Sequence, residues 1–485
     1  MKDHIDNYDY DHLCHFQGSK SPDYEKVNMK NMSISDYVIR NRTLEAKSLN
    51  GILPSNSSGR SIPKTLKIKT SSDSFSLTPN TSRIIHHDYK GNLDEIIEWS
   101  FNICEEINNT SKTNEFINNF ASPIRLEHIL INNNYVTGIF FDNAELKEKI
   151  NNSKITLKAL GNPLSKRKIN QLFRYLDGII EINQTIQNNE FKLPIKNKEK
   201  NTSKIHLGKN LITIKSKILE SITINEVNTP PISLQAFINK EKNFSAVFNS
   251  PNYSYYSRAC FEDKGAIKNI NNIIKILNGN HNFNGVKEEK SKPHPDSLKR
   301  FPLDSLFRYI EDNYCNKADI VFCDDMGDEW ADHISIDITS GIPCMTFIHS
   351  KLTKKDKYGA SAFHEVVSQA LKNIGRTKSI KKLFDDKKSK WDSNYEQTQI
   401  PRTIKNNKIQ NFDEILDTFF QNPNSTTKIV LATPFFSKSK LEKELKSISN
   451  GNFSKPYHTQ LIWLLNTFSS SCNDYGVQAE ILCKP

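Results

Sequence analysis

Apolar and polar positions follow a readable order in the C-terminal third of the chain. Residues 301–315 carry apolar side chains at helical spacing, which predicts an amphipathic helix. Its apolar face would consist of Leu303, Leu306, Phe307 and Ile310. Short apolar or alternating stretches then predict strands at residues 318–325, 331–338 and 343–351. Further elements are predicted in the order helix 360–375, strand 428–435, helix 459–472 and strand 477–483. This region therefore reads as an α-β-β-β-α-β core with additional helices and strands after it.

The preceding part of the chain predicts a second, strand-rich domain. Residues 93–107 have helical spacing, and several stretches rich in β-branched and aromatic residues follow, interrupted by a predicted helix at 165–178. We interpret residues 91–290 as one mixed α/β domain with mainly antiparallel strands. Its sequence contains no group of residues that demands a particular activity.

Two other segments lack this periodicity. Residues 1–90 are rich in Ser, Asn, Lys and Asp, so we expect a poorly ordered polar region. Residues 285–300 are charged and contain Pro293 and Pro295, which is typical of a linker. The expected C-terminal domain therefore spans residues 298–485, and the fold class is α/β (α+β).

Composition narrows the class of protein without fixing its function. The net charge of +11 favours an anionic partner such as nucleic acid, although a genome rich in A and T also enriches Lys and Asn. The 8 cysteines include no C-x-x-C pair, so a zinc ribbon or thioredoxin-like motif is not supported. No apolar run reaches the roughly 18 residues that a membrane span needs. We expect a cytoplasmic protein without a membrane-embedded part.

The stretch DEWADHISIDITSGIPCMTFIHSK, residues 328–351, carries the candidate chemistry. It predicts two adjacent strands, with Asp332 near the start of the first and Lys351 at the end of the second. Alternate side chains of a strand share a face, so His349 and Lys351 are expected to point into the same cleft as Asp332. A carboxylate that holds Mg²⁺ beside a lysine that stabilises negative charge is suited to phosphodiester hydrolysis.

The order of these residues resembles a known superfamily. A helical Glu, a strand Asp, a strand that ends in Lys and a helical Gln are similar to the PD-(D/E)xK, or restriction-endonuclease-like, nucleases. More narrowly, residues 301–435 resemble the nuclease-like module of bacterial antiphage defence proteins, which often work beside helicases. The resemblance implies that Asp332 binds metal and that Lys351 is catalytic. It further implies roles for Gln369 as the helical Gln, Glu311 as the first-helix acid and the Ser350 carbonyl as a metal ligand.

The sequence departs from that pattern two residues before the lysine, where His349 replaces the second acid. An imidazole suits Mn²⁺ or Zn²⁺ better than Mg²⁺. The missing carboxylate could also be supplied by Glu329, Asp325 or Asp324, which precede Asp332. A third reading is that metal binding has been lost. The expected metal ligands are Asp332, His349, Glu329 and Asp325.

These observations lead to a functional expectation and two rivals. The leading one is an endodeoxyribonuclease that cleaves DNA with Mg²⁺ or Mn²⁺ in antiphage defence. The first rival is an inactive nuclease-fold module that binds nucleic acid or docks to a helicase or NTPase. The second is a purely structural subunit whose basic charge reflects genome composition. Taken one by one, Asp332 could only cap a strand turn and Lys351 could be a solvated strand end.

Two further features bear on partners. The cations of residues 375–391 could follow a phosphate backbone or simply form a solvated loop. No G-x-x-x-x-G-K-[ST] motif occurs, so the chain is not expected to hydrolyse nucleotides itself. The sequence is compatible with a homo-oligomer but does not give the oligomeric state.

Overall fold

The computed structural model divides the chain into two compact units. The first comprises Met1–Asn269 with Phe453–Gln460, and the second comprises Ile270–Asn452 with Leu461–Pro485. The structure describes residue 16 and residues 22–485 except for 34, 36, 52–59, 72, 82, 88–89, 110–115, 142, 177–178, 183–189, 193–201, 227–228, 241–243, 264, 266, 268–269, 354–359, 406–410 and 453–455. Each unit is described by itself.

The described part of the first unit contains four sheets, and all of their pairings are antiparallel. The first has the order β2 (Asn41–Glu45), β1 (Asp23–Asn31), β3 (Ser61–Lys69), β4 (Ser74–Thr78) and β5 (Arg83–His86). The second has the order β10 (Ile180–Glu181), β7 (Val136–Phe141), β16 (Phe244–Phe248), β17 (Tyr253–Tyr256), β18 (Ala259–Glu262) and β6 (Ser122–Ile124). The smaller sheets are β11 (Glu190–Lys192), β12 (Thr202–Leu207) and β13 (Ile212–Ser216), and β15 (Ile232–Ser233), β14 (Ile222–Glu226), β8 (Ile155–Ala159) and β9 (Asn162–Pro163).

Short helices connect these strands. They are α2 (Leu93–Asn109), α3 (Leu126–Ile131), α4 (Ala144–Asn151), α5 (Lys166–Leu176), α6 (Lys217–Glu220) and α7 (Leu234–Lys240). The helices expected at residues 93–107 and 165–178 are therefore present, and the antiparallel character of the region is as expected.

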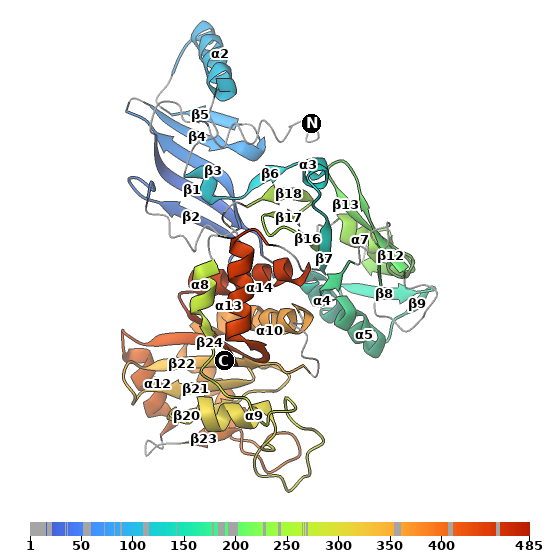
Figure 1. The fold of residues 1–485 in the computed structure, drawn as a ribbon, viewed down its shortest axis with the longest axis vertical. Coiled ribbons are helices and arrows are strands. Elements are labelled where there is room, and N and C mark those ends of the chain that lie inside the picture. The colour runs from blue at the N-terminus through green and yellow to red at the C-terminus, as the bar shows by residue number, and fades with distance from the viewer. Residues whose placement is uncertain are drawn as a thin grey trace. The chain divides into compact units, whose positions relative to one another are not determined.

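The expectation of a poorly ordered region over residues 1–90 is corrected by the structure. Residues 23–86 contain the five-stranded sheet of β1 to β5, coloured blue in Figure 1. It has its own apolar core, in which Tyr24, Val27, Leu66 and Ile68 are buried. The strands bury only one face, so polar side chains occupy every other position and dilute the apolar pattern. Residues 1–15 and 17–21 lie outside the described part of the chain.

The second unit is built on one mixed sheet of seven strands. Their order is β19 (Leu277–Asn278), β25 (Gln478–Lys484), β24 (Thr426–Ser437), β22 (Cys344–Ser350), β21 (His333–Asp337), β20 (Ile320–Cys323) and β23 (Thr403–Lys405). β20, β21 and β22 pair antiparallel, as do β20 and β23, whereas β22, β24, β25 and β19 are parallel. The helices are α8 (Ile270–Lys275), α9 (Leu306–Tyr309), α10 (Ala360–Asn373), α11 (Lys381–Trp391), α12 (Phe412–Gln421), α13 (Lys438–Ser449) and α14 (Pro456–Asp474), most of which lies in this unit.

Apolar packing fixes α9 against one face of this sheet. Leu306 and Ile310 share a buried cluster with Ile348 of β22 and Val430 of β24. A π-helical turn, Ile310–Tyr314, continues α9. Because side chains alternate along a strand, His349 lies on the face opposite Ile348. Figure 1 shows α9 beside the strands β20 to β23 of the second unit.

The predicted order of elements is present in this unit. α9, β20, β21, β22, α10 and β24 follow one another along the chain, with α11, β23 and α12 between α10 and β24. The molecule is thus a mixed α+β protein. Among the described residues, no helix combines the length and apolar character that crossing a membrane requires.

The segment expected to be a linker, residues 285–300, belongs to the second unit, which begins at Ile270. Its backbone pairs with the start of α9, where Leu306 N donates to Glu288 O at 2.9 Å and Phe307 N donates to Glu289 O at 3.1 Å. Several of its charged side chains form ion pairs within the unit, among them Glu289, Lys290 and Lys292. The charges that suggested a solvated linker therefore serve to attach the segment.

Candidate functional site

A loop between two central strands carries three acidic residues that the sequence analysis selected. β20 ends at Cys323 and β21 begins at His333, and Asp325, Glu329 and Asp332 lie between them. One carboxylate oxygen from each of the three lies within 4.8 Å of the others. We call Asp325, Glu329 and Asp332 the acid group. Oxygen ligands at this separation are of the kind that Mg²⁺ and Mn²⁺ bind.

Asp332 is fixed by the neighbouring strand. The register of β21 and β22 places His333 opposite Ile348, so the residue before His333 reaches the end of β22. There the Asp332 Oδ2 accepts a hydrogen bond from Ser350 N at 2.6 Å. The residue is only 9% exposed, and this burial raises the pKa of its carboxyl well above the ordinary value although the Ser350 N–H opposes the shift.

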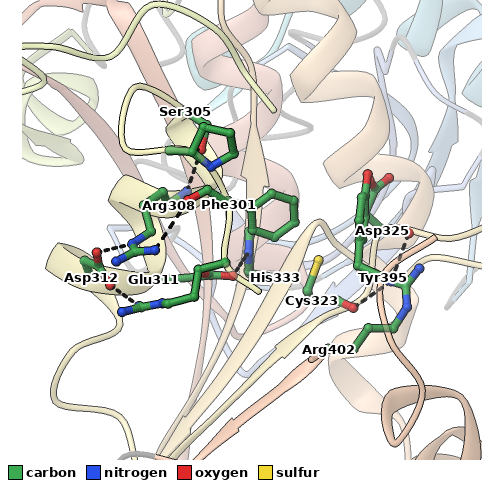
Figure 2. Close-up of polar contacts among 12 residues, drawn as sticks. Phe301, Ser305, Arg308, Glu311, Asp312, Cys323, Asp325, His333, Tyr395 and Arg402 are labelled. Carbon is green, nitrogen blue, oxygen red and sulfur yellow. Dashed lines mark hydrogen bonds and ion pairs between the residues drawn. The ribbon is translucent and has the colours of Figure 1, made fainter. Parts of the chain in front are cut away.

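Asp325 has two partners that were not anticipated. Lys290 Nζ lies 2.6 Å from Asp325 Oδ2, and the Tyr395 hydroxyl donates to the same oxygen at 2.7 Å. Burial alone would raise the pKa of Asp325, but Lys290 and Tyr395 outweigh it and lower the pKa. Figure 2 shows Tyr395 directed at Asp325 and the Arg402 guanidinium directed at the backbone of Cys323. Arg402 also donates to Asp325 O at 3.1 Å, which fixes the start of the loop.

Charge balance indicates that the acid group suits a cation. Burial and the neighbouring Asp325 raise the pKa of Glu329, although Lys290 opposes the shift. The Lys290 ammonium is hydrogen-bonded to one of the three carboxylates, that of Asp325. Burial is the first cause of the raised pKa values of Asp332 and Glu329, and the neighbouring carboxylates add to it. A bound divalent cation would favour the charged forms of both groups.

Lys351 directly follows β22, and its ammonium interacts electrostatically with Asp332 of the acid group. Its Nζ is 2.7 Å from Glu365 Oε1 of α10 and 3.8 Å from Glu289 Oε2. Burial would lower the pKa of Lys351, but Glu365, Glu289 and Asp332 outweigh burial and raise it. Its backbone N donates to Ala432 O at 3.0 Å, so the residue is held at the end of β22. Asp332 and Lys351 thus lie at the ends of adjacent strands and interact electrostatically.

A small hollow lies beside Lys290. It has a volume of about 250 Å³ and is lined by residues 287–292 together with Leu352. Lys290 and Glu289 both line it, and Glu289 also contacts Lys351. The segment expected to be a linker thus forms one wall of the site.

Gln369 lies on the helix that contacts Lys351. It is half-buried on α10, four residues after Glu365. Residues four apart share a helix face, so Gln369 is on the side of α10 that Lys351 contacts.

His349 and Glu311 are placed differently from the expectation. His349 is buried in β22 and is not a member of the acid group, and burial lowers its pKa to about 3. Glu311 is also outside the acid group. It lies in the π-helical turn and is directed at His333 (Figure 2). Its Oε1 is 3.6 Å from His333 Nε2. Sequence spacing gave the correct strand and helix for these residues but not the direction of their side chains.

Asp324 is also separate from the acid group. Its carboxylate is completely buried and accepts hydrogen bonds from Lys387 Nζ at 2.6 Å and from Trp391 Nε1 at 2.8 Å. Burial raises the pKa of Asp324 and lowers that of Lys387, and their attraction opposes both shifts. Asp324 therefore has a role in packing rather than in supplying the missing acid.

The basic stretch 375–391 is largely engaged in ion pairs. Lys381, Lys387, Lys388 and Lys390 are paired with acids at distances from 2.5 to 3.8 Å. These lysines fasten α11 to its neighbours, which does not favour the interpretation that the stretch follows a phosphate backbone.

The residues that sequence reasoning missed are Lys290, Glu289 and Tyr395. Each lies 35 or more residues along the chain from the residue that it contacts. The local sequence pattern therefore gives no sign of these contacts. No family model, no curated protein and no solved structure matches this chain.

Proposed function

We propose that the second unit is a metal-dependent nuclease that hydrolyses phosphodiester bonds of DNA, with bacterial antiphage defence as its setting. The main observation in support is the acid group, in which one carboxylate oxygen each of Asp325, Glu329 and Asp332 lies within 4.8 Å of the others. The charged Lys351 interacts electrostatically with Asp332. The order α9, β20, β21, β22, α10 and β24 supports the restriction-endonuclease-like assignment.

The residues present divide the chemistry between them. Asp332, Asp325 and Glu329 would hold Mg²⁺ or Mn²⁺, which when bound would neutralise the phosphate and acidify a water. Ser350 N–H orients the Asp332 carboxylate, and Lys290 orients that of Asp325. The Lys351 ammonium would stabilise the negative charge that develops on the phosphate. Glu365 and Glu289 keep that ammonium charged and in place.

Cleavage of supercoiled plasmid by the full chain with Mn²⁺ or Mg²⁺ tests the proposal. We expect nicking that Lys351→Ala and Asp332→Ala abolish. Lys390→Ala is the matched control, because Lys390 is exposed and pairs with Asp328 at the surface. Equal cleavage by all four proteins would assign the activity to a contaminant or to another site.

A second function is favoured by one specific observation, the position of Lys290. Its ammonium already supplies a positive charge to Asp325, and His349 does not provide a further ligand to the acid group. In this reading the second unit binds nucleic acid or docks to a helicase or NTPase without cleavage.

Calorimetric titration separates the two functions. Heat of Mn²⁺ binding that disappears in Asp332→Asn supports the nuclease. Absence of binding at millimolar Mn²⁺, together with salt-sensitive and metal-independent DNA binding, supports the second function.

A further inference from the structure

A buried ion pair lies behind the loop that carries the acid group. Lys387 of α11 donates to both carboxylate oxygens of Asp324 at 2.6 Å, and the two side chains are 5% and 0% exposed. The carboxylate also accepts hydrogen bonds from Trp391 Nε1 at 2.8 Å and from Trp330 N at 2.7 Å. Asp324 is therefore saturated with donors from a helix and from its own loop.

These contacts hold the loop at its start, its middle and its end. Asp324 N donates to Asp332 O at 2.9 Å, which joins the first and last residues of the loop. Lys387 Nζ also donates to Asp328 O at 3.0 Å, next to Glu329. Asp325 directly follows Asp324, and Asp332 is bonded to Asp324 through the backbone. Glu329 lies between Asp328, which Lys387 holds, and Trp330, which Asp324 holds.

Aromatic rings surround this ion pair and favour one arrangement of its two side chains. The Lys387 ammonium lies 4.7 Å from the centre of the Trp330 ring and 5.7 Å from that of Trp391. Burial of two charges among aromatic rings is costly unless each keeps its specific partners, so one arrangement of the loop is strongly preferred. Three carboxylates that repel one another need such an external support.

We propose that Lys387 and Asp324 are positioning residues, which hold Asp325, Glu329 and Asp332 in the geometry that binds a divalent cation. This inference rests on the proposed function, because it assigns a supporting role at the same site. Neither residue touches the cation in this arrangement. Both act through the loop backbone.

The test measures Mn²⁺ affinity by electron paramagnetic resonance on the full chain. Lys387→Met is expected to weaken Mn²⁺ binding at least tenfold while near-ultraviolet circular dichroism shows that the protein is folded. Lys390→Met is the matched control, since Lys390 belongs to the same helix and contacts Asp328 of the same loop through an exposed pair. Its affinity should stay within twofold of the wild type.

Hydrogen exchange of the metal-free protein provides a readout that general destabilisation would not reproduce. In Lys387→Met, the amides of residues 324–332, including that of Trp330, should exchange at least tenfold faster. The amides of β24 should keep the wild-type rate.

Each outcome decides the question. Mn²⁺ affinity within twofold of the wild type in folded Lys387→Met overturns the positioning role alone. Absence of Mn²⁺ binding by the wild type overturns the metal site itself and this role with it. If Lys387→Met does not fold, the double variant Lys387→Met with Asp324→Asn is tested in its place, because it leaves no unpaired buried charge. A loss of at least threefold is expected there, because the bond to Asp328 O is still missing, and an unchanged affinity rejects the proposal.

Discussion

The Asp332 carboxylate accepts a hydrogen bond from the backbone N–H of Ser350, and this 2.6 Å contact ties the residue before β21 to the last residue of β22. The bond holds an acidic side chain in a site where it is only 9% exposed. Folding alone does not favour a buried carboxylate, since burial disfavours its charged form. The buried Asp332 carboxylate thus lowers the stability of the folded protein, and we interpret this as a sign that the residue has a function.

Asp332→Asn is expected to stabilise the metal-free protein by about 1–2 kcal/mol, because the amide oxygen still accepts from Ser350 N without a buried charge. The variant should also lose any rise in melting temperature on addition of Mn²⁺. Thermal melts with EDTA and with Mn²⁺ measure both effects. Asp386→Asn, an exposed change on α11, should leave both unchanged. A metal-free variant less stable than the wild type would contradict the interpretation.

Lys290→Met removes the ammonium that lies 2.6 Å from Asp325 Oδ2. The metal-free protein should lose about 1–3 kcal/mol of unfolding free energy, because a half-buried carboxylate loses its charged partner. Added Mn²⁺ should then raise the melting temperature by more than it does in the wild type, since the cation meets a larger deficit of positive charge. Lys299→Met serves as control, because Lys299 is an exposed lysine of the same segment. An equal or smaller Mn²⁺ effect in Lys290→Met would show that Lys290 does not share the site with the cation.

Glu311→Gln tests whether the first-helix acid takes part in metal binding. The side chain lies 3.6 Å from His333 and outside the acid group, so Mn²⁺ affinity should stay within about twofold of the wild type. Asp332→Asn should weaken the same affinity at least tenfold. Calorimetric titration of the two variants side by side makes the comparison. A tenfold loss in Glu311→Gln would return this residue to the ligand set that the family resemblance implies.

The predicted strands were sufficient to place Asp332 just before β21 and Lys351 just after β22, because these two strands are adjacent in the sheet. They were not sufficient for Asp324 and Asp325. These neighbours follow the same strand, yet one is directed to Lys387 of α11 and the other to Lys290. Which acid faces the site depends on partners 63 and 35 residues away, and local sequence does not contain that information.

Lys290 shows a second limit of sequence reasoning. Charges and prolines in residues 285–300 are typical of a linker, but they do not distinguish a solvated lysine from one that has an acid partner. The five-stranded sheet of residues 23–86 was missed for a related reason, since polar residues on its exposed face obscured the apolar positions. The order of elements in the C-terminal third was predictable because its strands and helices are buried and strongly apolar.

His349 gives the protein a dependence of stability on pH. Burial lowers its pKa in the folded protein from 6.5 to about 3, so the unfolded chain binds more protons between these two values. Stability contributed by the neutral imidazole is present above pH 6.5 and is lost as the pH falls below it. Between pH 7.5 and 5.5 the wild type should lose about 1.4 kcal/mol more unfolding free energy than His349→Gln, which cannot take up this proton.

Urea unfolding followed by tryptophan fluorescence measures this difference, since Trp330, Trp391 and Trp463 all belong to the second unit. His128→Gln, a change at an exposed histidine of the first unit, should leave the pH dependence of the wild type intact. If His349 were instead exposed to a ligand or to solvent, its pKa would lie near 6.5, and both variants would follow the wild type at every pH.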